Sequence, residues 1–222
     1  MAPDRVTTVP IQAVLWDFGG VFTTSPFDAF SRYERERGLP EDIIRRINSI
    51  NPDTNAWARL ERSELTPAAF DAAFLGEARE FGLSIPGRDV LALLSGDLRP
   101  RVVMAFKACK ARFKVGCITN NAPTGKGAGM SSSSEKAQAI ADVFSRFDHV
   151  IESSKAGVRK PDPRIYRMMC DALGVAPSAC VYLDDLGINL KPARDMGMAT
   201  IKVVSEEQLL GDLSQATGLS FT

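Results

Sequence analysis

This chain of 222 residues has few histidines and cysteines, and it has no excess of charge of either sign. Lys and Arg together number 27, and Asp and Glu also number 27, so the formal net charge is zero. This balance argues against a general binder of nucleic acid or of acidic membrane surfaces, because both attract basic proteins. No apolar run approaches the length of a membrane span either. We therefore expect neither a nucleic acid nor a membrane as a partner.

The four cysteines and the single histidine do not form a recognisable site. Apolar, regular-looking segments without close paired spacing contain Cys109, Cys117, Cys170 and Cys180. This pattern indicates reduced core thiols rather than a disulfide frame or a zinc site. His149 opens a run that looks buried, so we expect a structural role for it. The N-terminal residues MAPDRVTTVPIQ lack the apolar stretch of a secretory signal, and we expect a cytoplasmic location.

Short apolar runs alternate with segments of helical periodicity along most of the chain. Five runs have the character of buried strands: 13–16, 115–119, 149–152, 179–183 and 199–203. Between them, residues 101–113 and 162–174 place apolar side chains at helical spacings of three and four, and Gly174 is a natural helix stop. This alternation predicts an α/β fold with a doubly wound, mostly parallel sheet that is covered by helices on both faces.

Two segments depart from the alternation. Residues 25–96 carry amphipathic helical patterns without a strand, which predicts a helical insert between the two parts of an α/β core, 1–24 and 97–222. Residues 120–136 are rich in Gly and Ser and predict a mobile loop. This loop contains GKGAG but not the residue order of a nucleotide-binding P-loop.

Polar residues follow four of the five strand-like runs. In a doubly wound sheet, ligands bind beyond the carboxyl ends of the strands, so these residues are candidates for one shared site. They are Asp17, Thr119, Asn120, Lys160, Asp184, Asp185 and, one helical turn further on, Asn189. Carboxylates supply the oxygen ligands that Mg2+ prefers, and Lys, Thr and Asn side chains stabilise an oxyanion. A carboxylate in such a site can also attack phosphorus.

Four motifs in this order resemble the haloacid dehalogenase superfamily of phosphohydrolases. They are WDFGGVF (16–22), ITNN (118–121), IESSKAGVRKPDPRIY (151–166) and VYLDDLGINLKPARDMGMATIKV (181–203). Within the superfamily, they are most similar to the N-terminal phosphatase domain of soluble epoxide hydrolases and to the related domain of some acyl-CoA dehydrogenases. The resemblance implies a Rossmann-like core and a helical cap, which residues 25–96 would form.

The resemblance also implies a role for each residue that would contact the phosphate. Asp17 would be the nucleophile, and Thr119 and Asn120 would bind the phosphoryl oxygens. Lys160 would stabilise the negative charge shared by Asp17 and the phosphoryl group. The neighbouring Arg159 would face either solvent or the phosphate site.

The same resemblance implies a Mg2+ site. Asp17, the backbone carbonyl of Gly19, Asp184 and Asp185 would hold the ion, directly or through water. Asn189 would orient Asp185 or the loop near it. Mg2+ is thus the expected cofactor.

Gly19 departs from the pattern of the superfamily. Its phosphatases usually carry a second Asp at this position, which acts as general acid and then as general base. Such catalysis typically contributes about 10²–10⁴-fold to the rate. Three alternatives follow: another group or water supplies the proton, the substrate has a good leaving group, or turnover is slow.

We therefore expect a Mg2+-dependent phosphohydrolase that acts on a small organic phosphate monoester through an aspartyl phosphate on Asp17. One alternative is a metal-free haloacid dehalogenase, since halide leaves without a proton, although the pair Asp184 and Asp185 would then serve no purpose. Another is a non-catalytic regulatory protein that binds Mg2+ or a phosphorylated ligand, which Gly19 favours.

Overall fold

A five-stranded parallel sheet forms the centre of the protein. The computed structural model describes residues 9–127, 129–131 and 133–221. The strands are β1 (Ala13–Trp16), β2 (Lys114–Thr119), β3 (His149–Glu152), β4 (Cys180–Asp184) and β5 (Ala199–Lys202), in the order β3-β2-β1-β4-β5. All neighbours in the sheet run parallel. The predicted α/β fold is therefore confirmed, with each predicted strand displaced by at most one residue at either end.

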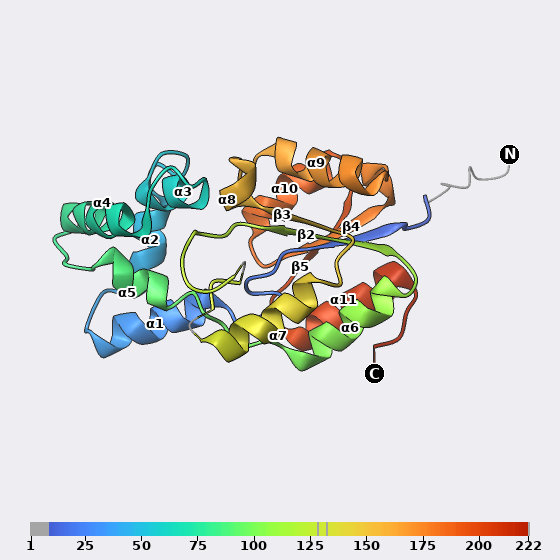
Figure 1. Ribbon diagram of the computed structural model, residues 1–222, viewed down its shortest axis with the longest axis horizontal. Coiled ribbons are helices and arrows are strands. Elements are labelled where there is room, and N and C mark those ends of the chain that lie inside the picture. Colours follow the sequence, from blue (N-terminus) through green and yellow to red (C-terminus); the bar gives the residue numbers. More distant parts are fainter. Residues whose placement is uncertain (1–8, 128, 132, 222) are drawn as a thin grey trace, which may run out of the picture.

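Helices cover both faces of the sheet (Figure 1). One face packs against α9 (Pro163–Leu173) and α10 (Gly187–Asp195), and the other against α6 (Pro100–Lys110), α7 (Ser134–Phe144) and α11 (Glu206–Thr217). Residues of β1 alternate between the two cores because successive strand residues point to opposite faces. Val14 and Trp16 belong to the core with α6, whereas Ala13 and Leu15 belong to the core with α9.

Local signals explain where several helices begin and end. Asp162 caps α9 by accepting the Arg164 backbone N–H at 2.9 Å, and Gly174 ends it with φ +61°. Helix α6 ends at Lys110, three residues before the predicted end. The predicted loop 120–136 is also too long, because Ser133 caps α7 from residue 134 onward. Positions 128 and 132 of that loop lie outside the described residues.

We call residues 25–96 the helical segment, because they contain helices and no strand. The helices are α1 (Pro26–Glu36), α2 (Ile43–Ser49), α3 (Ala56–Glu61), α4 (Pro67–Glu80) and α5 (Gly87–Ala92). Most of the segment's buried apolar residues form a cluster separate from the two sheet cores, and this cluster also includes Ala122 of the loop after β2. It lies at the carboxyl-end side of the sheet, beside the short helix α8 (Ser153–Ala156) (Figure 1). The chain leaves and returns at the antiparallel bridge between Thr23 and Leu98. That this segment forms a domain of its own stays a prediction.

The remaining sequence expectations concern side chains and membranes. All four cysteines are buried and free, as expected of core thiols. His149 begins β3, but this edge strand is fully buried only at Ile151, so the expectation of a buried run is wrong there. The side chain of His149 is exposed, and its structural role stays a prediction. Among the residues described, no helix combines the length and apolar character needed to cross a bilayer. A short 3-10 helix, η1 (Pro177–Ala179), leads into β4.

Candidate active site

Asp17 and Asp184 lie between β1 and β4, the point at which the strand order of the sheet reverses. From β1 the chain moves outward to β2 and β3, and later to β4 and β5 on the other side. Asp17 directly follows β1, and its backbone N–H donates to the Leu183 carbonyl of β4 at 2.8 Å. Asp184 ends β4, so the parallel pairing of β1 and β4 brings the two carboxylates to the same edge. This is the crevice in which doubly wound sheets bind ligands.

Lys160 connects the two strand ends. Its Nζ lies 2.8 Å from Asp17 Oδ1 and 2.8 Å from Asp184 Oδ2, and its side chain is only 1% exposed. Burial alone would lower the pKa of this ammonium, but the two adjacent carboxylates raise the pKa above its ordinary value. Lys160 is therefore held as a cation between two acidic side chains.

The carboxylate of Asp184 accepts hydrogen bonds from several protein groups besides Lys160. Tyr182 Oη donates to Oδ2 at 2.5 Å, and the Leu186 backbone N–H donates to Oδ1 at 2.8 Å. Asn189 Nδ2 lies 3.0 and 3.1 Å from the two oxygens. Because Asp184 is fully buried, these donors compensate the loss of water around its charge.

The position of Asn189 corrects one expectation. Its side-chain amide donates to Asp184, not to Asp185, and its carbonyl accepts the Tyr166 hydroxyl at 2.6 Å. Asn189 lies buried in the first turn of α10, and from there its amide reaches both carboxylate oxygens of Asp184 at the end of β4. Asn189 thus orients the carboxylate that holds Lys160.

Asp17, Asp184 and Asp185 form an acidic cluster whose nearest carboxylate oxygens all lie within 4.8 Å of one another. Burial raises the pKa of Asp17 well above its usual value, although Lys160 opposes this, and the two other acids add to it. Burial and the charge of Asp184 raise the pKa of Asp185 to about 6. Three carboxylates face one ammonium here, so the site suits a hard divalent cation with oxygen ligands.

The glycines after Asp17 differ in what surrounds them. A Cβ on Gly20, whose φ is +72°, would lie 2.1 Å from Asp185 Oδ2, so only glycine lets the chain pass this carboxylate. The Gly20 carbonyl accepts a hydrogen bond from Arg99 Nη1 at 3.0 Å. A Cβ on Gly19, in contrast, would meet no atom within 4 Å. The position where related phosphatases carry an acid is therefore open in this protein.

The end of β2 contributes residues from the other side of β1. Thr119 is the buried last residue of the strand. The side chain of Asn120 holds the backbone of Lys160: its Oδ1 accepts the Lys160 N–H at 2.9 Å, and its Nδ2 donates to the Lys160 carbonyl at 3.0 Å. Asn121 binds Ser153 through its backbone N–H at 3.0 Å. The predicted site residues of β1, β2, β4 and the lysine loop therefore meet at one edge of the sheet.

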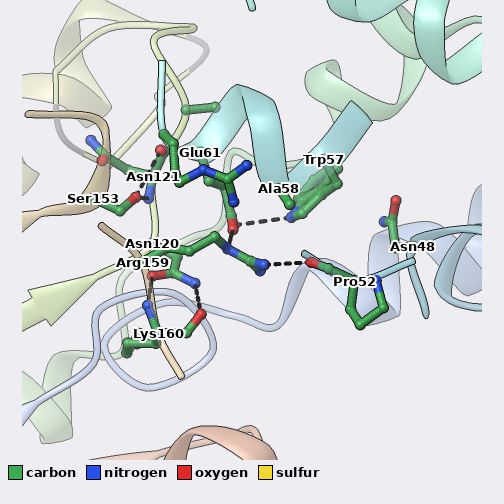
Figure 2. A network of polar contacts seen from close by, with 12 residues as sticks. Asn48, Pro52, Trp57, Ala58, Glu61, Asn120, Asn121, Ser153, Arg159 and Lys160 are labelled. Atoms are coloured by element: carbon green, nitrogen blue, oxygen red, sulfur yellow. Dashed lines mark hydrogen bonds and ion pairs between the residues drawn. The ribbon is translucent and has the colours of Figure 1, made fainter. Parts of the chain in front are cut away.

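Arg159 lies in neither of the two places expected for it. Its side chain is 19% exposed and turns toward the helical segment, where Nε donates to Glu61 Oε2 at 2.6 Å (Figure 2). Sequence reasoning also missed Tyr182 and Arg99. The spacing of Tyr182 and Asp184, two residues apart on one strand, is a signal that could have identified Tyr182, because such residues share a face.

The chain as a whole also matches a described protein family. The family model for haloacid dehalogenase-like hydrolases covers residues 11–197. This protein belongs to the haloacid dehalogenase-like hydrolases. The matched residues include Asp17, Lys160, Asp184 and Asp185, so the site described above lies within the part of the chain that the family model covers.

Three relatives of known name are similar over most of the chain. Pig bifunctional epoxide hydrolase 2 is 29% identical over 94% of this chain and 39% of its own length. Mouse acyl-CoA dehydrogenase family member 10 is 30% identical over 93% of this chain and 19% of its own length. The chain thus spans well under half of these relatives. A phosphatase of Mycobacterium tuberculosis is 32% identical, with 85% of each chain covered.

Solved structures support the same fold. A predicted haloacid dehalogenase-like hydrolase from Porphyromonas gingivalis matches with a TM-score of 0.64 and 18% identity, covering 93% of this chain and 98% of its own. A family enzyme from Bacteroides thetaiotaomicron, in complex with magnesium and inorganic phosphate, matches with a TM-score of 0.58 and 17% identity. It covers 88% of this chain and 96% of its own. These structures support the Rossmann-like core, and the family model establishes the hydrolase family.

Proposed function

We propose that this protein is a Mg2+-dependent phosphatase that hydrolyses a small organic phosphate monoester, with Asp17 as the nucleophile. The observation that carries the proposal is the position of Lys160, 2.8 Å from both Asp17 and Asp184, beside a third carboxylate. The similarity to a mycobacterial phosphatase over 85% of the chain supports this choice of reaction.

The acidic cluster fits a Mg2+ ion. We assign Asp17, Asp185 and the backbone carbonyl of Gly19 to its ligands, since a carbonyl contact needs no side chain. Asp184 already accepts hydrogen bonds from several protein donors, so its contribution to the ion would be through water. When bound, Mg2+ would neutralise charge on the phosphate and on the carboxylates.

The residues of the chain would carry out two displacements at phosphorus. First, a carboxylate oxygen of Asp17 attacks, the bond from phosphorus to the ester oxygen breaks, and the alcohol leaves. Water then attacks the aspartyl phosphate, which releases inorganic phosphate and restores the carboxylate. Lys160 balances the negative charge throughout, and the Thr119 hydroxyl and the Asn120 backbone N–H would donate to the phosphoryl oxygens.

The leaving alcohol needs a proton, and Gly19 has no group that could donate one. We therefore assign this proton to water, which favours substrates with weakly basic leaving groups. The helical segment would act as a cap over the strand ends and would bind the organic part of the substrate. Its place on the carboxyl-end side of the sheet supports this role (Figure 1).

Replacement of the nucleophile tests the proposal. In the variant Asp17→Asn, phosphate release from an aryl phosphate with Mg2+ should fall to background, because the amide is a poor nucleophile. Circular dichroism should show an unchanged fold. Equal release by the wild type and the variant would contradict the mechanism.

Two further measurements separate the alternatives. Halide release from a 2-haloacid that persists in EDTA would indicate a dehalogenase. Binding of Mg2+ without multiple turnovers on a panel of phosphate esters would indicate a regulatory protein. We expect neither result.

A further inference from the structure

An ion pair between a buried glutamate and a partly buried arginine joins the helical segment to the loop that carries Lys160. Arg159 Nε donates to Glu61 Oε2 at 2.6 Å, and the two side chains are 19% and 9% exposed. Arg159 Nη1 also donates to the Pro52 carbonyl at 2.9 Å. One guanidinium thus holds two parts of the helical segment, the end of α3 and the turn before it (Figure 2).

Glu61 is fixed from its other side as well. The indole N–H of Trp57, one turn earlier on α3, donates to Glu61 Oε1 at 2.9 Å. Burial raises the pKa of Glu61, and Arg159 and Trp57 oppose this shift. Burying the Glu61 carboxylate has a desolvation cost that offsets part of the attraction to Arg159, so stability alone is a weak reason for such a pair.

Arg159 is followed directly by Lys160, whose position is fixed at both ends. Its backbone N–H and carbonyl bind the Asn120 side chain, and its ammonium bridges Asp17 and Asp184. Arg159 and Lys160 share one peptide unit, so a shift of the Arg159 backbone acts directly on the contacts of Lys160. The contacts form an unbroken path from α3 to the nucleophile.

A second contact lies at the same junction. The Ser63 hydroxyl, just after α3, donates to the Ser154 carbonyl of α8 at 2.7 Å. This bond is exposed and uncharged, whereas the Glu61 contact is partly buried and charged, so the ion pair sets the geometry of the junction more strictly. The nearby ion pair of Arg62 and Glu64 joins two residues of the helical segment. Among the described residues, the hydrogen bonds of the Glu64 side chain go to Arg62.

We propose that Glu61 is a positioning residue that acts through Arg159 to place the Lys160 ammonium, so that docking of the helical segment and assembly of the phosphate site are one event. This inference rests on the proposed phosphatase function. It extends that function by assigning a role to a residue of the helical segment that touches no reacting atom.

The variants Glu61→Gln and Arg159→Met, their double variant and the control Glu64→Gln test this assignment with an aryl phosphate and Mg2+. Each single variant should lower kcat at least about tenfold and change KM less than about threefold. The double variant should be no worse than the more affected single variant, because both changes break one contact. Glu64→Gln should keep the kcat of the wild type.

Fluorescence supplies a readout that does not depend on catalysis. The protein has two tryptophans, and Trp16 is fully buried in the sheet core, so changes in emission and in acrylamide quenching report on Trp57. Glu61→Gln and Arg159→Met should both increase quenching, and Glu64→Gln should not. If Glu61→Gln does not fold, Arg159→Lys takes its place. A lysine keeps the positive charge but loses the simultaneous hydrogen bonds of the guanidinium to Glu61 and to the Pro52 carbonyl.

Each outcome of these measurements either supports or overturns the inference. Wild-type kcat in both single variants, an effect confined to KM, an equal loss in Glu64→Gln, or additive losses in the double variant would each overturn the inference. If the wild type itself released no phosphate, the proposed function would fail and this inference with it. An active wild type with equally active variants would overturn the inference alone.

Discussion

Gly19 stands where the resemblance leads us to expect an acid, and the space around it is open. An aspartate introduced there could donate a proton to the leaving oxygen. In Gly19→Asp we expect turnover of alkyl phosphates to rise at least about tenfold more than turnover of aryl phosphates, since only a basic leaving group needs the proton. Steady-state rates on a matched pair of esters measure this difference.

The matched control is Gly19→Asn, which has the same shape but no acidic proton. It should leave the ratio of alkyl to aryl turnover unchanged. If Gly19→Asp leaves this ratio unchanged too, the proton comes from another group and the water assignment is wrong.

A substitution at Gly20 should have a different effect, because a side chain there would collide with Asp185, a proposed metal ligand. The Cβ of Gly20→Ala would lie 2.1 Å from Asp185 Oδ2 and would push this carboxylate away. We expect the Mg2+ concentration for half-maximal activity to rise at least about tenfold, beyond the cost of about 1 kcal/mol in stability for alanine at positive φ. Titration of activity with Mg2+ measures the change.

The control Gly218→Ala separates the effect of backbone strain at positive φ from the effect of a collision with Asp185. Gly218 has φ +71°, close to the +72° of Gly20, but nothing lies within 4 Å of its Cβ position. It should lose similar stability and keep the Mg2+ requirement of the wild type. A shifted requirement in both variants would contradict the proposed contact with Asp185.

At the scale of single residues, sequence predicted which side chains meet but not always their partners. Asp17, Lys160 and Asp184 were predictable because each follows a strand or a motif at the carboxyl edge of the sheet. The pairing of Arg159 with Glu61 was not, since the two lie 98 residues apart and meet only when the helical segment docks. Local spacing has no information on such a contact.

Among larger elements, strands were predicted more accurately than loops. The runs of β1 and β4 are fully buried, so their apolar pattern is continuous and marks their ends. The loop after β2 was predicted too long because Gly and Ser are common both in loops and at helix starts. Ser133 is a helix cap, and only the position of its side chain distinguishes the two.

The connection between β2 and the lysine loop gives a prediction at this scale. Asn120→Ala removes the two hydrogen bonds to the Lys160 backbone and leaves a buried N–H and carbonyl unpaired. We expect a stability loss of about 1–3 kcal/mol and a fall in kcat of at least about tenfold, because Lys160 loses its fixed position. Urea unfolding and steady-state kinetics measure the two effects.

Asn121→Ala is the comparison. Its side chain binds Glu152 and Ser154 and does not touch Lys160. It should lose comparable stability but less activity than Asn120→Ala. Equal losses of kcat would mean that general loosening of the loop, and not the hold on Lys160, is responsible.

For the molecule as a whole, the acidic cluster couples metal binding to stability. Because the pKa of Asp185 is raised, its ionised form destabilises the folded state without metal at neutral pH. Mg2+ that binds only the folded protein adds about 2.7 kcal/mol at 100 times its Kd, which for a chain of this size is about 5–10 °C in Tm. Thermal unfolding in Mg2+ and in EDTA measures this shift.

The variant Asp185→Asn sharpens the test, because it removes one of the repelling charges and one proposed ligand together. In EDTA it should have a Tm equal to or above that of the wild type, since the amide ends the repulsion by Asp184. In Mg2+ the order should reverse, because the variant has lost a hard oxygen anion for the ion. A wild-type Tm that is the same in Mg2+ and in EDTA would show that these carboxylates do not form a metal site, and the proposed function would lose its cofactor.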